Sequence, residues 1–551
     1  MSPNVIFNGE ANNIIFEAIK VPKSPPCETR ESIWVRRLAL LSFWATALFL
    51  GFPVWWKTTT VYRAPLPLQK MLDWADGKIC RPTFPLRIAV EAGLPPLEAQ
   101  HMLRTTQHAL DDMNDFSSHH LRLVIPDKTR NNTQVSRSSP ENIGQDQEDI
   151  AMTINLISDT VGTTPRAVLH NFESVMDIYY TPNQIPSSSS TGSPLATFIA
   201  NELQNTFNEE QAVLAYSMAS TSWHPSQWKS ISQEMADSLA KRKTRTFKYA
   251  PTYHLTFSLF TPNAMPSDWD IEDALHDYLA PLLQSLSVVS NFTVDSQVQL
   301  YAALSPSIAG PQYDESKQVW TLVKEDLGGF INAAEWPLSP SIGDGPTINF
   351  ILYIPSTKQS PLLLDENGGT SWLIPQWGGV QILNLGRKQF QLSKTDLEPV
   401  MRTFSHQLIS LLGLPQEPGS FPLRLSTLIR VHAASLIFSA SSTLGAIARL
   451  TQSLSSIAIP DTVARDVEQT MAHLDSACTS LKNGRFHQAL ESAKLAELKA
   501  ERAFFEPSMV AMVYFPDEHK IAVYLPLLGP VAVPLIMSAM KEFKAFRQSR
   551  G

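Results

Sequence analysis

Residues 38–56 (LALLSFWATALFLGFPVWW) form a run of 19 residues without a charged side chain, and residues 521–540 (IAVYLPLLGPVAVPLIMSAM) form a second run of 20. At about 1.5 Å of rise per residue, each run is long enough to cross a hydrocarbon core of about 30 Å as a helix. The chain as a whole is 43% hydrophobic and 17% charged, as is typical of a globular protein. We therefore predict a two-pass membrane protein with one large folded region between its spans.

Each run has an alternative interpretation. The first could be a cleavable secretory signal, but 37 residues precede it, and Trp55, Trp56 and Lys57 stand where small residues would mark a cleavage site. A retained signal anchor fits better. The second could be a buried core helix, but Tyr524 near its start and Lys541 directly after it are typical of a membrane span.

The basic residues beside the two runs predict their orientation. Five Lys or Arg residues lie in the 20 positions before the first run, against three in the 20 after it. Four lie in the 11 residues after the second run, against two in the 20 before it. Because Lys and Arg near a span favour the cytoplasmic side, both termini are predicted to be cytoplasmic and residues 57–520 to lie outside the cytosol.

The net charge limits the partners of the large region. The whole chain has a net charge of −8, while the leader and the tail are both positive, so residues 57–520 carry −12. A domain with this charge binds polyanions poorly, and we expect no nucleic-acid partner.

Cysteines and glycosylation sequons in the large region fit the same topology. Cys80 and Cys478 would lie in an oxidising compartment, where they can form a disulfide if their Cα atoms come within about 7 Å. The sequence leaves open whether they do. Sequons begin at Asn131 and Asn291, and Asn131 lies in a polar stretch that indicates an exposed loop.

The large region has the pattern of a mixed α/β domain. We predict two strands, at residues 85–92 and 120–126, with a helix between them near 96–115. A second unit of strand, helix and strand is predicted between residues 253 and 301. This similarity suggests a weak duplication, although no residues repeat clearly. Further predicted elements are a helix at 194–207 and strands at 347–354 and 372–385.

From Ser393 the spacing becomes helical and remains so to Phe505, with a break at Asn483-Gly484 that predicts a helical hairpin. These predictions divide the chain into six parts: a cytoplasmic leader at 1–37, a span at 38–56, an α/β region at 57–392, a helical region at 393–520, a span at 521–540 and a cytoplasmic tail at 541–551.

No catalytic motif is present. The sequence lacks G-x-S-x-G, H-E-x-x-H, the phosphate-binding G-x-x-x-x-G-K-[ST] and G-x-G-x-x-G. Cys478 lies in an apolar helical stripe, which favours a structural role over a nucleophilic one. The acidic stretch DWDIEDALHD, residues 268–277, is typical of a helix start rather than of a metal site. We expect no catalytic residue, metal or cofactor.

Both predicted spans contain residues that are typical of helices in contact with other protein subunits. Pro526, Pro530 and Pro534 share one helix face and leave carbonyl groups that need partners within the bilayer, so this face is a candidate subunit contact. Ala47 and Gly51 have the spacing of small residues that allows another helix to approach closely.

Three separated blocks resemble the PIG-S family: residues 51–67 (GFPVWWKTTTVYRAPLP), residues 373–380 (LIPQWGGV), and residues 504–510 (FFEPSMV) with 514–520 (YFPDEHK). Members of this family are subunits of the glycosylphosphatidylinositol (GPI) transamidase of the endoplasmic reticulum membrane. The resemblance therefore implies a lumenal large domain and a non-catalytic role in attaching GPI anchors. It also implies partners, namely a caspase-like catalytic subunit, the other transamidase subunits, membrane lipid, GPI and the precursor protein.

The second block also contains a candidate subunit contact at Trp377, Gly378 and Gly379, for which a strand with a glycine bulge is the alternative. Two other functions stay open at this point. One is a membrane-tethered lumenal hydrolase, and the other is a cell-surface receptor ectodomain.

Overall fold

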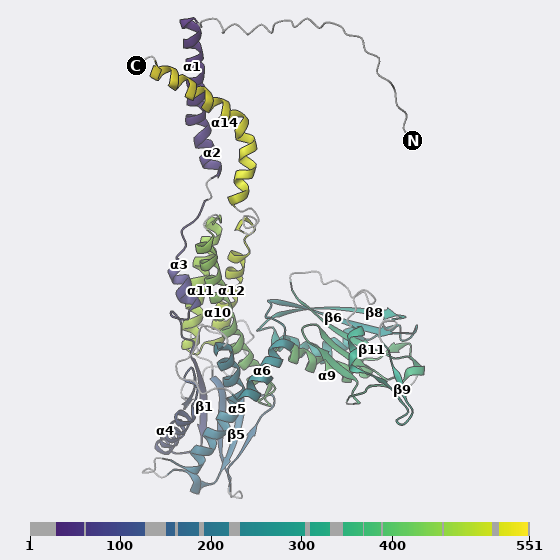
Figure 1. The fold of residues 1–551 in the computed structure, drawn as a ribbon. Coiled ribbons are helices and arrows are strands. Elements are labelled where there is room, and N and C mark those ends of the chain that lie inside the picture. Colours follow the sequence, from purple (N-terminus) through teal and green to yellow (C-terminus); the bar gives the residue numbers. More distant parts are fainter. Residues whose placement is uncertain are drawn as a thin grey trace, which may run out of the picture. The chain divides into compact units, whose positions relative to one another are not determined.

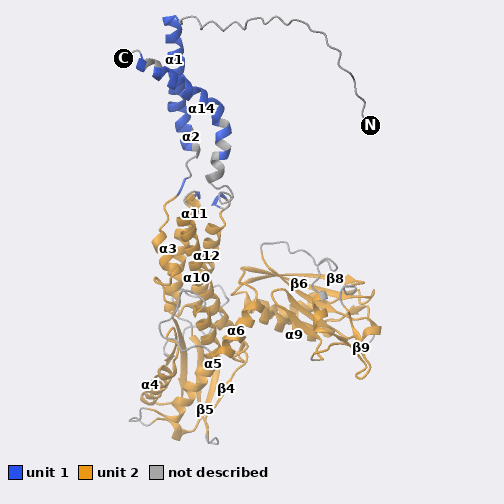
Figure 2. Ribbon diagram, in the orientation of Figure 1, with its two compact units in different colours: residues 1–63, 456–458, 508–551 blue, residues 64–455, 459–507 orange. Residues whose placement is uncertain are grey.

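The computed structural model describes residues 29–59, 62–126, 150–159, 164–186, 192–219, 232–302, 309–330, 345–366, 368–386, 389–454, 457–509 and 517–548. The chain forms two compact units (Figure 2). Unit 1 comprises residues 1–63, 456–458 and 508–551, and unit 2 comprises residues 64–455 and 459–507.

Unit 1 contains the helices at the two ends of the chain (Figure 1). α1 (Arg30–Thr46) continues through a π-helical turn (Ala47–Gly51) into α2 (Phe52–Thr59), and α14 (Asp517–Gln548) is a single helix of 32 residues. Large apolar side chains on these helices are exposed, among them Leu38, Leu41, Phe49, Leu525, Leu528 and Val533.

In the described part of the chain, two helices are long and apolar enough to cross a membrane. One covers residues 30–54, of which none is buried in the protein. The other is α10 (Phe421–Ser453), but 61% of its apolar window is buried inside unit 2, as is typical of a core helix. α14 covers the second predicted span, and its insertion into the membrane stays a prediction.

Unit 2 is a mixed α/β structure, which confirms the mixed α/β part of the predicted fold class. Its first sheet has the strand order β2 (His119–Val124), β1 (Phe84–Ala92), β3 (Ile150–Ser158), β5 (Val175–Tyr180) and β4 (Arg166–Leu169). All neighbours pair in parallel except β4, which is antiparallel to β5. α4 (Pro96–Met113) connects β1 to β2 and contacts α5 (Pro194–Ala219), which follows β5 in the chain.

The second sheet repeats this arrangement. Its order is β8 (Asn291–Leu300), β6 (Thr252–Thr261), β11 (Thr347–Tyr353), β14 (Gly378–Ile382) and β13 (Ser371–Ile374), and only β13 is antiparallel. A helical segment connects β6 to β8 through α7 (Ile271–Ala274), a π-helical turn (Leu275–Leu279) and α8 (Ala280–Leu286). α9 (Lys394–Leu411) follows β14 and packs on it. Strand order, strand direction and helix positions are thus duplicated.

Smaller sheets complete the second half. β9 (Gln312–Asp314), β10 (Val319–Leu322) and β12 (Leu362–Leu364) form a three-stranded sheet whose buried leucines share a core cluster with Phe260, Tyr353 and Ile382. β7 (Asp268–Trp269) pairs with β15 (Gln391–Leu392).

The helical part of unit 2 is a bundle. α10 contacts α3 (Leu68–Ala75) and α12 (Phe486–Phe504), and α12 lies along α11 (Asp461–Lys482). The turn between α11 and α12 contains Gly484 with a φ of +69°, a conformation that glycine adopts without a steric penalty.

Two predicted elements differ from the structure. The predicted strand at 372–385 is a hairpin, β13 and β14, because the chain reverses at Gln376, which has a φ of +54°. The predicted helix at 194–207 continues to Ala219, since buried residues recur along its full length.

Candidate functional site

The predicted site residues lie in several parts of the structure. In the described residues, no group of three or more His, Cys, Asp or Glu side chains is arranged to hold a metal ion. The acidic stretch contains β7 and the start of α7, where Asp270 is the N-cap residue and Asp277 forms an ion pair with Lys394 of α9.

Cys80 and Cys478 form a disulfide with their Cα atoms 6.2 Å apart. The bond joins the segment after α3 to α11, and both cysteines are buried. A disulfide-bonded cysteine has no thiolate, so neither residue is available as a nucleophile in this structure.

The structure describes one of the two predicted glycosylation sites. Asn291 is the first residue of the edge strand β8, and its side chain is exposed, as an acceptor requires. Thr293 of the same sequon shares a hydrogen bond with His254. Asn131 lies outside the described residues. Glycosylation of both asparagines stays a prediction.

The block around Trp377 has an internal packing role. Gly378 and Gly379 are buried in β14, and a Cβ atom on Gly379 would lie only 1.9 Å from Oε1 of Gln407 on α9. A Cβ atom on Gly378 would lie 1.8 Å from the carbonyl oxygen of Asn349 on β11. The two glycines therefore allow α9 and β11 to approach β14, while Trp377 packs against the neighbouring core cluster. A subunit contact here stays a prediction.

The prolines of α14 are all exposed within unit 1. Pro526, Pro530 and Pro534 lie inside the helix and on its surface, where a partner helix could contact them. Trp56 is exposed as well and lies 6.0 Å from Phe52 between ring centroids. The described residues of unit 1 leave the three prolines exposed, and the predicted subunit contact stays a prediction.

A buried ion pair joins the first α/β half of unit 2 to the bundle. Arg430 of α10 donates to both carboxylate oxygens of Glu210 on α5, at 2.5 and 2.6 Å, and the Thr427 hydroxyl donates to the same carboxylate at 2.7 Å. Burial by itself would raise the pKa of Glu210, but the Arg430 guanidinium outweighs this effect and holds that pKa well below its usual range. The pair is therefore charged and fixed.

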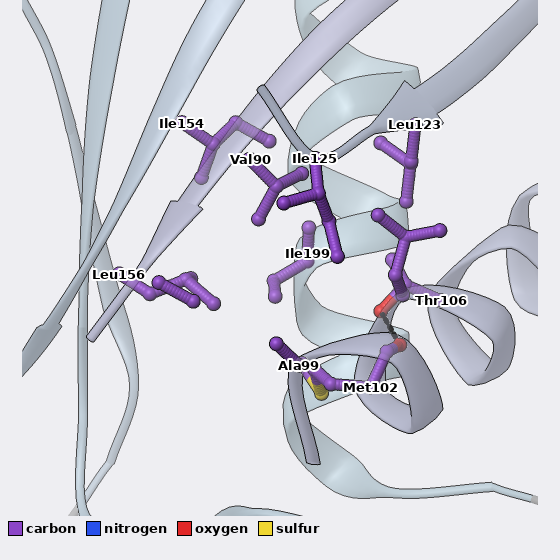
Figure 3. A pocket seen from close by; sticks show the side chains of 11 residues that line it. Val90, Ala99, Met102, Thr106, Leu123, Ile125, Ile154, Leu156 and Ile199 are labelled. Carbon is purple, nitrogen blue, oxygen red and sulfur yellow. Dashed lines mark hydrogen bonds between the residues drawn. The ribbon is translucent and has the colours of Figure 1, made fainter. Parts of the chain in front are cut away.

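The first sheet has a small apolar cavity at the carboxyl ends of β1 and β3 (Figure 3). In parallel α/β sheets a ligand crevice commonly lies at this place, where the strand order reverses. Here the cavity measures about 40 Å³, and its lining is apolar except for Thr106, whose hydroxyl donates to the carbonyl oxygen of Met102. A space of this size and polarity does not fit a polar ligand.

A larger cavity of about 550 Å³ lies among α5, the basic helix α6 (Gln233–Arg245), α10 and α12. We call it the junction cavity. Part of its wall is apolar, formed by Val213, Leu239, Phe247, Leu428, Leu436 and Phe438. Its polar lining includes the bases Arg242, Lys243 and Lys248, and one carboxylate, Glu497.

Glu497 is only 7% exposed. Its Oε1 accepts a hydrogen bond from Ser439 at 2.6 Å and lies 4.0 Å from Nζ of Lys248, whereas its Oε2 has no partner in the described residues. Burial raises the pKa of this carboxyl group. On the same cavity, desolvation and the charge of Lys494 lower the pKa of His432 to about 4, so its ring is neutral at physiological pH.

Arg242 forms an ion pair with Glu209 through Nη1, while its buried Nη2 has no partner in the part of the chain that the structure describes. Two residues that line the junction cavity thus each have one buried polar atom without a partner in the described residues. The amino-acid sequence alone does not predict this cavity. Its one signal was the run KRKTRTFK at residues 241–248, with five bases inside an acidic region.

Two like α/β sheets and a helical bundle define a mixed α/β protein, and its exposed N-terminal helix is long and apolar enough to cross a membrane. The family model described as PIG-S, phosphatidylinositol-glycan biosynthesis class S protein, matches residues 42–549. The chain belongs to this family, which confirms the resemblance seen in the three sequence blocks.

Curated relatives span nearly the same length. The "GPI-anchor transamidase component PIGS" of Mus musculus is 28% identical over 92% of this chain and 95% of the relative. The "GPI transamidase component PIG-S homolog" of Schizosaccharomyces pombe is 29% identical over 94% of this chain and 85% of the relative. The "GPI transamidase component GPI17" of Saccharomyces cerevisiae is 25% identical over 92% of both chains.

Proposed function

We propose that this chain is a non-catalytic structural subunit of a GPI transamidase in the endoplasmic reticulum membrane, where it supports attachment of GPI anchors to precursor proteins. The observation that carries this proposal is the family match over residues 42–549, together with relatives that are named as transamidase components and that the chain covers over 85 to 95% of their length. A match of this extent includes the whole of unit 2, α14 and the N-terminal helical segment from residue 42 onward.

The nucleophile belongs, in this proposal, to a separate caspase-like subunit. The disulfide between Cys80 and Cys478 supports this division of labour, because it engages both cysteines of the proposed lumenal region. A stable disulfide also fits the oxidising lumen.

The proposed topology places both termini in the cytoplasm and residues 57–520 in the lumen. The Lys and Arg distribution supports it. A contact inside unit 1 agrees with it: Arg36 and Arg37 contact Glu542 at 2.6 and 3.0 Å. The two arginines precede the first apolar run and Glu542 follows the second, so these residues would meet on one side of the membrane.

The subunit acts, in our proposal, through binding energy. Contacts made by the lumenal unit and by the helices hold the catalytic subunit and the precursor in a productive arrangement, which lowers the entropic cost of the reaction. The proline face of α14 and the small residues Ala47 and Gly51 supply the contacts within the bilayer, since backbone carbonyls freed by proline require protein partners there.

Purification from cells in mild detergent tests the assignment. We expect the tagged chain to co-purify with a protein of caspase-like fold, and a chain recovered only as a monomer would contradict the proposal. Substitution of Pro526, Pro530 and Pro534 by leucine should reduce this recovery. The matched control, leucine at Val531, Ala532 and Ile536, which lie off the proline face of the helix, should preserve it.

Two further measurements separate this function from the alternatives. In cells that lack the native gene, a Cys80→Ser/Cys478→Ser chain that assembles should still support anchor attachment, whereas loss of attachment by an assembled complex would indicate a thiol enzyme. Glycans at Asn291 should be of the high-mannose type. Mature complex glycans would point to a cell-surface ectodomain instead.

A further inference from the structure

We propose that β8 is an interaction edge, to which a partner protein adds an extended segment as a further strand of the second sheet. The segment that fits alternates apolar and polar residues and carries a basic residue opposite Asp295. β8 is an edge strand of ten residues that lies next to β6 (Figure 1). The function proposed above names no surface of unit 2, so this inference goes beyond it and stands on the geometry of the strand alone.

The pairing of β8 with β6 shows which of its backbone groups lack a partner strand. The two strands are parallel, and the N–H group of Asn291 donates to the carbonyl oxygen of Pro251 at 2.8 Å. In a parallel pair every second residue of a strand turns both its N–H and its C=O group toward the neighbour, and from Asn291 onward these are the odd-numbered residues. The even-numbered residues turn both groups outward, namely Phe292, Val294, Ser296 and Val298. In the described residues no further strand pairs with this side of β8.

β8 is open on its faces as well as along its edge. Six of its ten residues are exposed and none is buried, whereas nine of the ten residues of β6 are buried. Val294 and Val298 are 39% and 38% exposed. A glycan on Asn291 would project from one face at the start of the strand and leave the edge itself open. A partner segment therefore reaches the outward backbone groups without displacing any part of the chain that the structure describes.

β8 also lacks the features that usually protect such an edge. Natural edge strands are short, or they carry Lys, Pro or a β-bulge, because a long regular edge pairs readily with another chain. The other edges of the two five-stranded sheets follow this rule, since β2 has six residues and carries Arg122, and β4 and β13 have four residues each. β8 contains no Lys, Arg or Pro, and its register with β6 runs from Asn291 to Leu300 without a bulge. The contrast within one duplicated fold identifies β8 as the edge that is available to a partner.

The side chains of β8 define the chemistry of the partner segment. Successive side chains of a strand point to opposite faces, so Phe292, Val294 and Val298 share an apolar face. The opposite face is polar, and Asp295 is its only charged residue. A segment that alternates apolar and polar residues matches both faces, because side chains directly opposite each other on neighbouring strands pack together. Opposite charges are favourable in such pairs, so a Lys or Arg of the segment fits beside Asp295.

Charge favours a segment of another protein over a second copy of this chain. Residues 57–520 carry a net charge of −12, so two copies that meet at this edge repel each other. A basic segment is attracted by the same charge. The partner is therefore an extended, basic segment rather than the β8 strand of a second molecule.

Fluorescence anisotropy on the full-length chain in detergent tests the edge. The probe is a labelled, capped peptide of alternating valine and threonine with one central lysine. We expect saturable binding that Val294→Pro weakens about tenfold or more, because proline removes an outward N–H group and interrupts the new ladder. Val294→Thr keeps this N–H group and is the matched control, which should change the affinity less than about threefold. The native sheet does not use the N–H group of Val294, so the proline variant should keep the melting temperature of the unaltered chain.

Two further arms hold even if the proline variant does not fold. N-methylation of every second amide of the probe should abolish binding in one register and preserve it in the other, because an added strand turns only alternate amides toward the edge. Asp295→Lys should weaken binding of the lysine probe several-fold and strengthen binding of a probe that has glutamate in the place of lysine. An absence of saturable binding, or an equal loss in both N-methyl registers, would overturn the proposal. So would a chain that forms dimers sensitive to Val294→Pro and does not bind the probe, since the occupant would then be a second copy.

Discussion

Substitution of Glu210 by glutamine should destabilise unit 2 by about 3–5 kcal/mol, because it leaves the Arg430 charge buried without its counter-ion. Both side chains are only 2% exposed, so water cannot replace the lost partner. Unfolding entropy of about 2.1 cal/mol/K per residue, applied to the roughly 440 residues of unit 2, converts this loss into a melting temperature lower by about 3–5 °C. The conversion assumes that unit 2 unfolds cooperatively.

Thermal unfolding of the full-length chain in detergent, followed by intrinsic fluorescence, measures this effect. Glu398→Gln is the matched control, since its pair with Arg402 is exposed on α9 and contributes only about 0.3–0.5 kcal/mol. A double variant, Glu210→Gln with Arg430→Met, should recover more than half of the loss because it removes both buried charges. A shift below 1 °C for Glu210→Gln, or an equal shift for the control, would refute the reasoning.

Three other perturbations have defined outcomes. Cys80→Ser/Cys478→Ser should lower the free energy of unfolding by about 2–5 kcal/mol, and an unchanged melting curve under non-reducing conditions would show that the bond adds nothing. Gly379→Val should cost about 1–3 kcal/mol through its collision with α9, whereas Gly386→Val, where a Cβ atom meets nothing within 4 Å, should be nearly neutral by the same thermal measurement. The pKa of His432 is about 4 in the folded chain, below the usual value of 6.5 that it has in the unfolded chain. Between these two pH values the unfolded chain binds a proton at His432 and the folded chain does not. The free energy of unfolding should therefore fall by about 2–3 kcal/mol as the pH drops from 6.5 to 4. His432→Phe should flatten this slope in a pH series of unfolding curves, and an unchanged slope would contradict the assignment.

Long periodic elements were predictable from the sequence, and short ones were not. The strand predicted at 85–92 is β1, and the strand predicted at 253–260 is β6, since runs of eight to ten residues show their alternation clearly. β4 and β12, with four and three residues, are too short for a periodic signal and depend on neighbouring strands. The hairpin turn at Gln376 gave no signal because the residue in the left-handed conformation is not glycine or asparagine.

The candidate sites also differ in whether the sequence could predict them. Cys80 and Cys478 could be proposed as a pair because only three cysteines exist and one lies in the leader. The junction cavity could not be predicted, because its lining comes from segments that begin at α5 and end at α12, nearly 300 residues apart in the chain. The basic run at 241–248 by itself is equally typical of an exposed helix end.

The duplicated fold explains why the large cavity lies where it does. Parallel sheets of this order commonly bind ligands beyond the carboxyl ends of their strands. In the first sheet that place is filled by aliphatic side chains such as Val90 and Ile154. In the second it is covered by the β9–β10–β12 sheet, whose leucines pack with Tyr353 at the end of β11.

Another cavity lies between the duplicated halves and the bundle. The junction cavity takes its walls from α5 of the first half, from α6 in the connection, from Leu412 at the end of α9 in the second half, and from the bundle. These walls connect both halves to the bundle, so a change in the packing of either half against the bundle would also change the shape of this cavity.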